Sequence, residues 1–381
     1  MGLIASLDMG AETMVMALGS VEEQSVNLEL IKFQISQGIE RGVIKDWELV
    51  KNGIDTLQTE LLKGREIEVL NVSLSGAVWQ VKEHRVWINL HKKYVEKGDL
   101  VRAEQRCREI LKGEEIIDLI PVAYAVDRGN WIGNPLGKSG RELEVIYLVY
   151  QIDSNYLTQL HTLFKKFNNI CFYPPVRAYQ KVLPIVEGKE LVLVDLGASG
   201  IQMALYKEGM LVHEAHLPLG CRTIDQDIMF AYGMNNLQAH KLKHEHGEAL
   251  RSLCKNRKVQ IPDTNLTLES RDLATIVQSR AEELLEGVAY MLQEWGCNDE
   301  ESKILLTGGG CRLKNIDILL QRLSGISVEK VVLQNPSTSR GDVLKTPEYV
   351  VALGLLMCCP NELEEEESLV DRLMERLKKL W

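Results

Sequence analysis

Two segments of the chain place an aspartate and, two residues later, a glycine directly after a short run of apolar residues. Asp8 and Gly10 follow the first run, and Asp195 and Gly197 follow the second. A glycine at such a turn lets backbone N–H groups approach an anion closely, and a carboxylate beside it can hold a divalent cation through water. One copy alone more often makes only a tight turn. Two copies favour a phosphate-binding site with Asp8 and Asp195 near Mg²⁺.

The two segments resemble each other over their whole length, which indicates an internal duplication. Residues 8–18 (DMGAETMVMAL) and 195–205 (DLGASGIQMAL) share a strand end, an Asp-x-Gly turn and a returning strand. A repeat spaced by about half the chain predicts a duplicated α/β domain rather than a solenoid. A third turn, Gly308-Gly309-Gly310, would form a flat floor for a nucleoside, because any Cβ there would collide with it.

Strands and amphipathic helices alternate in both halves, which predicts the α/β class. We expect buried strands at 3–7, 191–194 and 304–306, each ending at one of the glycine-containing turns. Helical periodicity occurs at 47–62, 100–111, 155–167, 177–186, 237–246, 271–294 and 347–357. Between residues 76 and 152 the pattern changes to one helix among short strands, which predicts a separate inserted module. Its strands are expected at 77–81, 86–90, 119–126 and 143–150.

Composition excludes several classes of protein. The 381 residues carry 44 Lys and Arg against 54 Asp and Glu, a net charge of −10, which argues against nucleic acid as a partner. The 8 cysteines form no CxxC pair, so neither a disulfide framework nor a zinc ribbon is indicated. The N-terminus lacks the pattern of a signal peptide, and no apolar stretch approaches the ~20 residues of a membrane span. We therefore expect a cytoplasmic protein.

The last residues of the chain predict an amphipathic helix behind an acidic spacer. Pro360 ends the preceding helix, glutamates fill much of 360–367, and a new helical pattern begins at Ser368. The polar face of 368–381 has more basic than acidic residues, which is typical of a helix lying in a membrane interface. The alternative is an ordinary helix packed on the body or on a second chain. The membrane-facing residues would be Leu369, Val370, Leu373, Met374, Leu377, Leu380 and Trp381.

The order of these motifs is similar to that of the actin, Hsp70 and sugar-kinase ATPase superfamily, and it resembles most closely the FtsA family of bacterial cell-division proteins. That resemblance implies an actin-like duplicated ATPase fold with a small inserted α+β subdomain and a C-terminal amphipathic helix. The segments that carry it are SQGIERGVIKD (36–46), NVSLSGAV (71–78), NPLGKSGRELE (134–144), LPLGCRTIDQDI (217–228), LQAHKLKHEHGEAL (237–250), LLTGGGCRLKNI (305–316) and TPEYVVALGLLM (346–357).

The resemblance also implies a site for ATP and Mg²⁺ at the three glycine-containing turns. Gln180 lies in a segment that resembles the one carrying a water-positioning glutamine in actin, so it is the candidate for hydrolysis. The alternative for Gln180 is a solvent-facing helix residue. The two phosphate loops would contain Asp8, Gly10, Ala11 and Glu12 in the first, and Asp195, Gly197, Ala198 and Ser199 in the second. The nucleoside would lie between His240 and Lys243 on one side and Gly308, Gly309 and Arg312 on the other.

The chain departs from the family at both phosphate loops. The first loop of the family usually continues with two small hydroxyl residues and a lysine, where this chain has Ala11, Glu12 and Thr13. The second usually continues with Gly-Gly-Thr-Thr-Asp, where residues 198–202 read ASGIQ, and His240 stands where the family commonly has glutamate. Repulsion between Glu12 and a terminal phosphate would reduce nucleotide affinity or turnover, so we expect at most a weak ATPase.

The resemblance implies a division of the chain into subdomains. The first core subdomain would comprise 1–76, 153–185 and 340–359, with the inserted subdomain at 77–152. The second core subdomain would comprise 186–224 and 295–339, with an outer helical subdomain at 225–294. The acidic linker at 360–367 and the membrane-targeting helix at 368–381 would complete the chain.

The function that the resemblance implies is that of a filament-forming adaptor. Such proteins polymerise on the cytoplasmic face of the inner membrane at the division site and tether the ring protein FtsZ to it. The expected partners are FtsZ, further copies of the chain, anionic lipids and other division proteins. One alternative is a pilus-assembly scaffold of the same fold, which lacks such a tail. Another is a small-molecule kinase, for which we find no acidic residue placed as a base beside an acceptor pocket.

Overall fold

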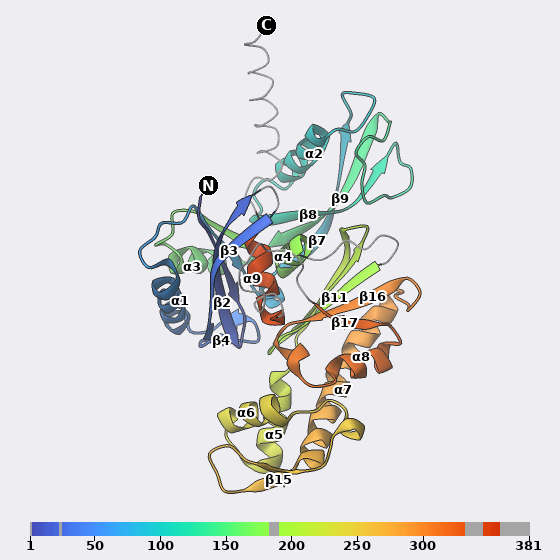
Figure 1. The fold of residues 1–381 in the computed structure, drawn as a ribbon. Coiled ribbons are helices and arrows are strands. Elements are labelled where there is room, and N and C mark those ends of the chain that lie inside the picture. The colour runs from blue at the N-terminus through green and yellow to red at the C-terminus, as the bar shows by residue number, and fades with distance from the viewer. Residues whose placement is uncertain (1, 23–24, 183–189, 332–345, 359–381) are drawn as a thin grey trace.

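The computed structural model describes residues 2–22, 25–182, 190–331 and 346–358, and two five-stranded sheets form its centre (Figure 1). The strand orders are β10-β6-β1-β2-β3 and β13-β12-β11-β16-β17. In each sheet an antiparallel meander, β1–β2–β3 or β11–β12–β13, pairs in parallel with a later strand, β6 or β16. The predicted duplication is therefore confirmed in the sheet topology.

The strands of the first sheet are β1 (Ile4–Met9), β2 (Thr13–Glu22), β3 (Ser25–Ile35), β6 (Val69–Ser73) and β10 (Ile170–Tyr173). Those of the second sheet are β11 (Glu190–Leu196), β12 (Ile201–Lys207), β13 (Met210–Leu217), β16 (Ser302–Thr307) and β17 (Val328–Lys330). The predicted linker and C-terminal helix, and residues 183–186 of the helix predicted at 177–186, lie outside the described residues.

The outer face of the first sheet packs on two helices, α1 (Trp47–Leu62) and α3 (Ser154–Leu163), beside the small hairpin of β4 (Ile39–Glu40) and β5 (Val43–Ile44). Helix α1 has the bounds that the sequence predicts. Its first turn is fixed by Asp46, whose Oδ1 accepts hydrogen bonds from the backbone N–H groups of Glu48 and Leu49.

Two short helices join the halves, α4 (Pro175–Val182) and α9 (Val350–Leu356), and Figure 1 shows them between the sheets. All seven residues of α9 are buried. The Ser6 hydroxyl donates to the carbonyl of Ala352 (2.6 Å), and a Cβ on Gly354 would lie 2.2 Å from the carbonyl oxygen of Ala178. The two helices therefore pack closely on each other and on β1, in a core that includes residues of both sheets.

The second half carries an outer module at the bottom of Figure 1. It contains α5 (Arg222–Tyr232), α6 (Asn236–His246), β14 (Lys258–Gln260), β15 (Thr267–Glu269) and part of α7 (Ser270–Glu294), while α8 (Ile316–Ser324) covers the sheet. Helices α5 and α8 were not predicted from the sequence. Both helices are short. In addition, Thr223 and Ile224 at the start of α5 are β-branched, and such residues have a low helix propensity.

The inserted module consists of β7 (Gln80–Asn89), α2 (Lys97–Ile110), β8 (Ile116–Val126) and β9 (Glu142–Gln151), with the sheet order β7-β9-β8. The two strands predicted at 77–81 and 86–90 are parts of one strand, so the predicted break is wrong: a 3₁₀ turn at Gly76–Val78 takes the start of the first prediction, and β7 then runs without interruption. Polar residues at 82–85 separate the two predicted segments, but β7 is an edge strand and exposes Lys82, Glu83 and Arg85. Arg177 of α4 joins the module to the core through Asp118, at 2.6 and 3.0 Å.

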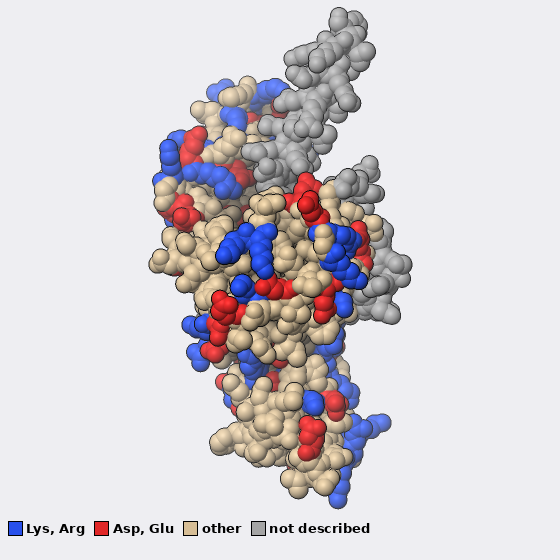
Figure 2. Space-filling model, turned by 90° about the vertical axis from the view of Figure 1, so that its left-hand side faces the viewer, with Lys and Arg blue, Asp and Glu red and all other residues tan. Residues whose placement is uncertain are grey.

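The surface distributes its charge without a dominant patch on the face that Figure 2 shows. Lys and Arg alternate there with Asp and Glu along the molecule. Of the helices within the described ranges, none combines the length and the apolar character needed to cross a membrane.

Candidate nucleotide site

A cavity of about 720 Å³ lies between the two halves and receives residues from both hairpins. Every residue predicted to bind nucleotide lines this cavity, whereas Gln180 does not. Its neighbour Tyr179 on α4 does. The lining residues predicted from the sequence are Asp8, Gly10, Ala11, Glu12, Asp195, Gly197, Ala198, Ser199, His240, Lys243, Gly308, Gly309 and Arg312.

The two Asp-x-Gly turns have the same backbone constraint. A Cβ on Gly10 would lie 2.5 Å from the carbonyl oxygen of Thr13, and a Cβ on Gly197 would lie 2.7 Å from that of Gly200. Both turns therefore need glycine, at equivalent places, for the chain to reverse this tightly. Residues of both turns line the cavity.

The Gly-Gly-Gly turn packs directly behind the second hairpin. Gly308 has φ +81°, and a Cβ on it would lie 2.1 Å from Oδ1 of Asp195. A Cβ on Gly310 would lie 2.4 Å from Sγ of Cys221, but one on Gly309 would meet only Cγ of Glu348 at 3.8 Å. Two of the three glycines are thus needed for packing within the protein, a reason that differs from the predicted collision with a nucleoside.

The carboxylates of Asp8 and Asp195 lie in a desolvated, acidic environment. Burial, and then the charge of Asp195, raise the pKa of Asp8 to about 8. Burial also raises the pKa of Asp195, but the Tyr179 hydroxyl, which donates to its Oδ2 at 2.6 Å, opposes that rise. A cation or a proton is therefore needed between the two turns to balance these charges.

The oxygen donors of the cavity fit Mg²⁺ only together with further oxygen ligands from outside the protein. Within the described part of the chain no group of three or more His, Cys, Asp or Glu side chains is arranged to hold a metal ion. Mg²⁺ prefers six oxygen ligands and commonly takes several from water and phosphate. Asp8 and Asp195 therefore fit a Mg²⁺ ion that is brought with a polyphosphate rather than one held by protein alone.

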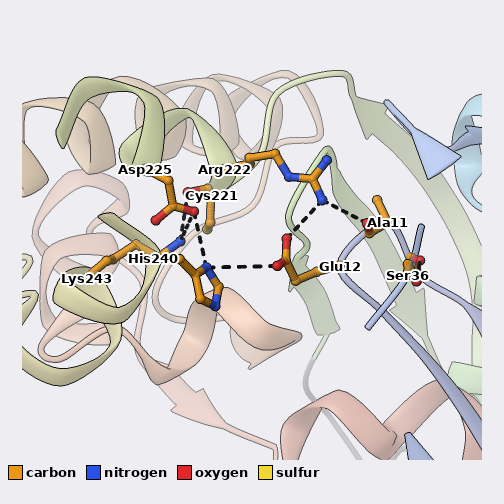
Figure 3. Close-up of polar contacts among 9 residues, drawn as sticks. Ala11, Glu12, Ser36, Cys221, Arg222, Asp225, His240 and Lys243 are labelled. Atoms are coloured by element: carbon orange, nitrogen blue, oxygen red, sulfur yellow. Dashed lines mark hydrogen bonds and ion pairs between the residues drawn. The ribbon is translucent and has the colours of Figure 1, made fainter. Parts of the chain in front are cut away.

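A network of charged residues crosses the cavity from the first hairpin to the outer module (Figure 3). Nη2 of Arg222, at the start of α5, donates to Oε2 of Glu12 at 2.9 Å and to the carbonyl oxygen of Ala11 at 2.8 Å. Nδ1 of His240 lies 3.9 Å from Oε1 of Glu12 and 3.5 Å from Oδ2 of Asp225. The Glu12 side chain is therefore turned toward the opposite wall of the cavity.

Lys243 is also part of this network. Its Nζ donates to Oδ2 of Asp225 at 2.7 Å and to the carbonyl oxygen of Cys221 at 3.3 Å. Asp225 is buried with 2% exposure, so Lys243 neutralises a carboxylate inside the protein. Arg312 likewise forms an ion pair with Glu348. Lys243 and Arg312, which were predicted to lie beside the nucleoside, thus line the cavity, and each pairs with a carboxylate of the protein.

Sequence reasoning missed Tyr179, Arg222 and Asp225. The last two lie in the segment LPLGCRTIDQDI, which served only to carry the family resemblance. The sequence feature that could have indicated them is Glu12, where the chain departs from the family pattern. A carboxylate added in a cleft is stable only with a cation opposite it, so a search for that cation could have found this segment. Tyr179 was one residue from the predicted Gln180, and the helix phase of α4 decided which of the two reaches the cavity.

Comparison with known proteins places this geometry in a family. The family model for cell division protein FtsA matches residues 192–354, and the model for the SHS2 domain inserted in FtsA matches residues 76–150. FtsA of Escherichia coli strain K12 is 24% identical over 378 residues, which cover 93% of this chain and 89% of that protein. FtsA of Bacillus subtilis strain 168 is 23% identical over 381 residues, which cover 94% and 84%.

Solved structures share the fold at low sequence identity. The PilM–PilN type IV pilus biogenesis complex contains a chain that is 15% identical, with a TM-score of 0.65, covering 93% of this chain and 97% of that one. MreB5 of Spiroplasma citri bound to ADP is 10% identical, with a TM-score of 0.57, covering 97% and 98%. The fold is therefore actin-like, as predicted, and the two matching models together span more than half of the chain. The chain belongs to the FtsA family of cell-division proteins.

Proposed function

We propose that the protein binds ADP or ATP with Mg²⁺ in the cavity between its two halves. The observation that carries the proposal is that both Asp-x-Gly hairpins and the Gly-Gly-Gly turn line one cavity. The fold neighbour MreB5, whose structure contains ADP, supports a nucleotide as the ligand.

The phosphates would lie between the two tight turns, where Gly10, Ala11, Ala198 and Ser199 line the cavity and would offer their backbone N–H groups. Mg²⁺ would neutralise the phosphates and the two aspartates, with water completing its shell. His240 and Lys243 would border one side of the nucleoside, and Gly308, Gly309 and Arg312 the other. Gly309, where a Cβ would make only an ordinary contact with Glu348, is the part of the turn least used for packing and so the part that could contact a ligand.

We infer that hydrolysis, if any, is slow. Hydrolysis needs a side chain that orients water in line with the terminal phosphate, and Gln180 does not reach the cavity. The nucleotide would then act as a structural ligand that sets the relation between the two halves.

We further propose that the protein is a peripheral adaptor of the division ring, working on the cytoplasmic face of the inner membrane. It would polymerise, bind FtsZ and other division proteins, and attach to anionic lipid through residues 368–381. One such helix binds a membrane weakly, but a filament presents many copies and raises their effective concentration. Polymerisation and membrane attachment would therefore reinforce each other.

Flotation on vesicles tests the anchor. The full chain should float with vesicles of phosphatidylglycerol and phosphatidylethanolamine, whereas a chain ending at residue 367 should stay in the dense fraction. Leu377→Glu, on the apolar stripe, should reduce flotation at least about tenfold, and the polar-face control Glu375→Gln should not. Failure of the full chain to float would remove the adaptor proposal and favour a pilus-type scaffold.

A further inference from the structure

The first phosphate loop carries its own anion, and the opposite wall of the cavity supplies the matching cation. Glu12 lies two residues after Gly10, and its carboxylate accepts a hydrogen bond from Arg222 at 2.9 Å (Figure 3). The two residues belong to different halves of the molecule, so this ion pair spans the cavity.

Arg222 donates hydrogen bonds to both phosphate loops. Its backbone N–H donates to the carbonyl oxygen of Ala198 in the second loop at 2.9 Å. Its guanidinium donates to the carbonyl oxygen of Ala11 in the first loop at 2.8 Å. A cation at this junction is well placed to meet the last phosphate of a nucleotide bound between the loops. In this chain it is already paired with Glu12.

Other cations that line the cavity have partners of their own: Arg312 pairs with Glu348, and Lys314 with Glu248. Lys243 is 2.7 Å from Asp225, a carboxylate with 2% exposure, and releasing it would leave a buried unpaired charge. His240 contacts Asp225 as well as Glu12. Arg222 is therefore the cation for which Glu12 and a terminal phosphate compete.

We propose that Glu12, paired with Arg222, makes this cavity select a nucleoside diphosphate over the corresponding triphosphate. The inference rests on the proposed nucleotide binding. A diphosphate leaves the ion pair in place. A triphosphate brings its third phosphate to the junction, takes Arg222 from Glu12, and leaves the carboxylate beside a like charge.

The size of the preference follows from Coulomb repulsion across a partly exposed site. Two like charges about 5 Å apart at an effective dielectric constant of ~20 repel enough for more than a tenfold change in affinity. Solvent screening reduces this figure, because the Glu12 side chain is 37% exposed. We expect the diphosphate to bind about tenfold more tightly than the triphosphate.

Competition against a fluorescent ADP analogue on the full-length protein tests the proposal, with ADP and ATP titrated in the presence of Mg²⁺. Glu12→Gln keeps the shape and removes the charge. It should tighten ATP binding about tenfold, change ADP binding less than about threefold, and so abolish the preference. Glu12→Ser, a second variant without the charge, should behave in the same way. Glu40→Gln is the control, because it makes the same change in net charge outside the cavity-lining residues.

Nucleotide selection and nucleotide binding fail in different ways. Equal ADP and ATP affinities in the native protein, or a preference that survives both Glu12 variants, would overturn the selection mechanism while nucleotide binding stands. Failure of the native protein and of both variants to bind either nucleotide would overturn the proposed function and this inference with it.

Discussion

The two duplicated hairpins share a backbone but present opposite chemistry to the cavity. In the first, the strand register places Val15 beside Asp8 and Phe33 beside Val15. In the second, it places Gln202 beside Asp195 and His216 beside Gln202. All six residues line the cavity. Duplication has therefore preserved the turn and the aspartate, while the row of side chains next to them is apolar in one copy and polar in the other.

Val15 and Gln202 are both buried, but the outer position of the polar row, His216, is more enclosed than Phe33 in the apolar row. Gln202 is 9% exposed, and its Oε1 and Nδ1 of His216 are buried without a hydrogen-bond partner in the described chain. A Cβ on Gly76, where the inserted module begins, would lie 2.2 Å from that Oε1. Phe33 in the first hairpin is 59% exposed. The first hairpin therefore borders open space at its outer strand, whereas the polar row of the second is enclosed by its surroundings.

The largest expected effect comes from filling the space behind the second hairpin. Gly308→Ala would force a Cβ against Asp195 at a positive φ, and we expect a loss of about 3 kcal/mol in the free energy of unfolding, measured by urea denaturation. Gly309→Ala in the same turn is the matched control, with an expected loss below about 1 kcal/mol because its Cβ finds ordinary contacts. Equal losses would show that Asp195 is not constrained by this turn.

The charge of Asp8 gives the next largest effect, and it depends on pH. Because the pKa of Asp8 is raised to about 8 from an ordinary value of 3.8, ionised Asp8 destabilises the nucleotide-free fold. This cost begins above pH 4, grows as the pH rises, and is complete above pH 8.

Asp8→Asn should therefore stabilise the protein in EDTA without nucleotide, by on the order of 2 kcal/mol at pH 9 and by little at pH 4. Thermal unfolding at both pH values measures the difference. A stabilisation that does not change with pH would contradict a role for the charge. Asp195→Asn should stabilise less, because that change also replaces the charged acceptor of the Tyr179 hydroxyl with a neutral amide oxygen and so weakens this hydrogen bond.

A smaller effect is expected from the hydrogen bond that distinguishes the second aspartate. Tyr179→Phe should cost about 1.5–2 kcal/mol, because its hydroxyl donates to a carboxylate. Tyr206→Phe is a control at a similarly buried site, where the hydroxyl donates to the carbonyl of Val176 at 3.0 Å, and should cost about 1 kcal/mol. Urea denaturation of both variants checks the order, and the reverse order would argue against a charged Asp195.

The fold could be predicted from sequence wherever one local signal was strong. Helix α1 has its predicted bounds because Asp46 caps it and its apolar stripe is regular. The two turns were found because their residues repeat. Strand β7 was split in two because the sequence does not reveal that this strand lies at an edge and exposes a polar run.

The site was predictable in its loops but not in its cross-cavity contacts. Glu12 and Arg222 are 210 residues apart, and no periodic pattern connects them. The choice between Tyr179 and Gln180 depends on the rotation of a helix of eight residues, which packing between the two sheets sets. Such features follow from tertiary structure, so they could be identified only after the halves were placed together.

If the two hairpins bind one nucleotide between them, both aspartates must be needed for its affinity. Calorimetric titration of ADP and Mg²⁺ into the full-length protein tests this most directly, with Asp8→Asn, Asp195→Asn and the inserted-module control Asp127→Asn. We predict one nucleotide per chain for the native protein and the control, and at least about tenfold weaker binding for each of the two hairpin variants. Undiminished binding when either hairpin aspartate is replaced would contradict a shared site.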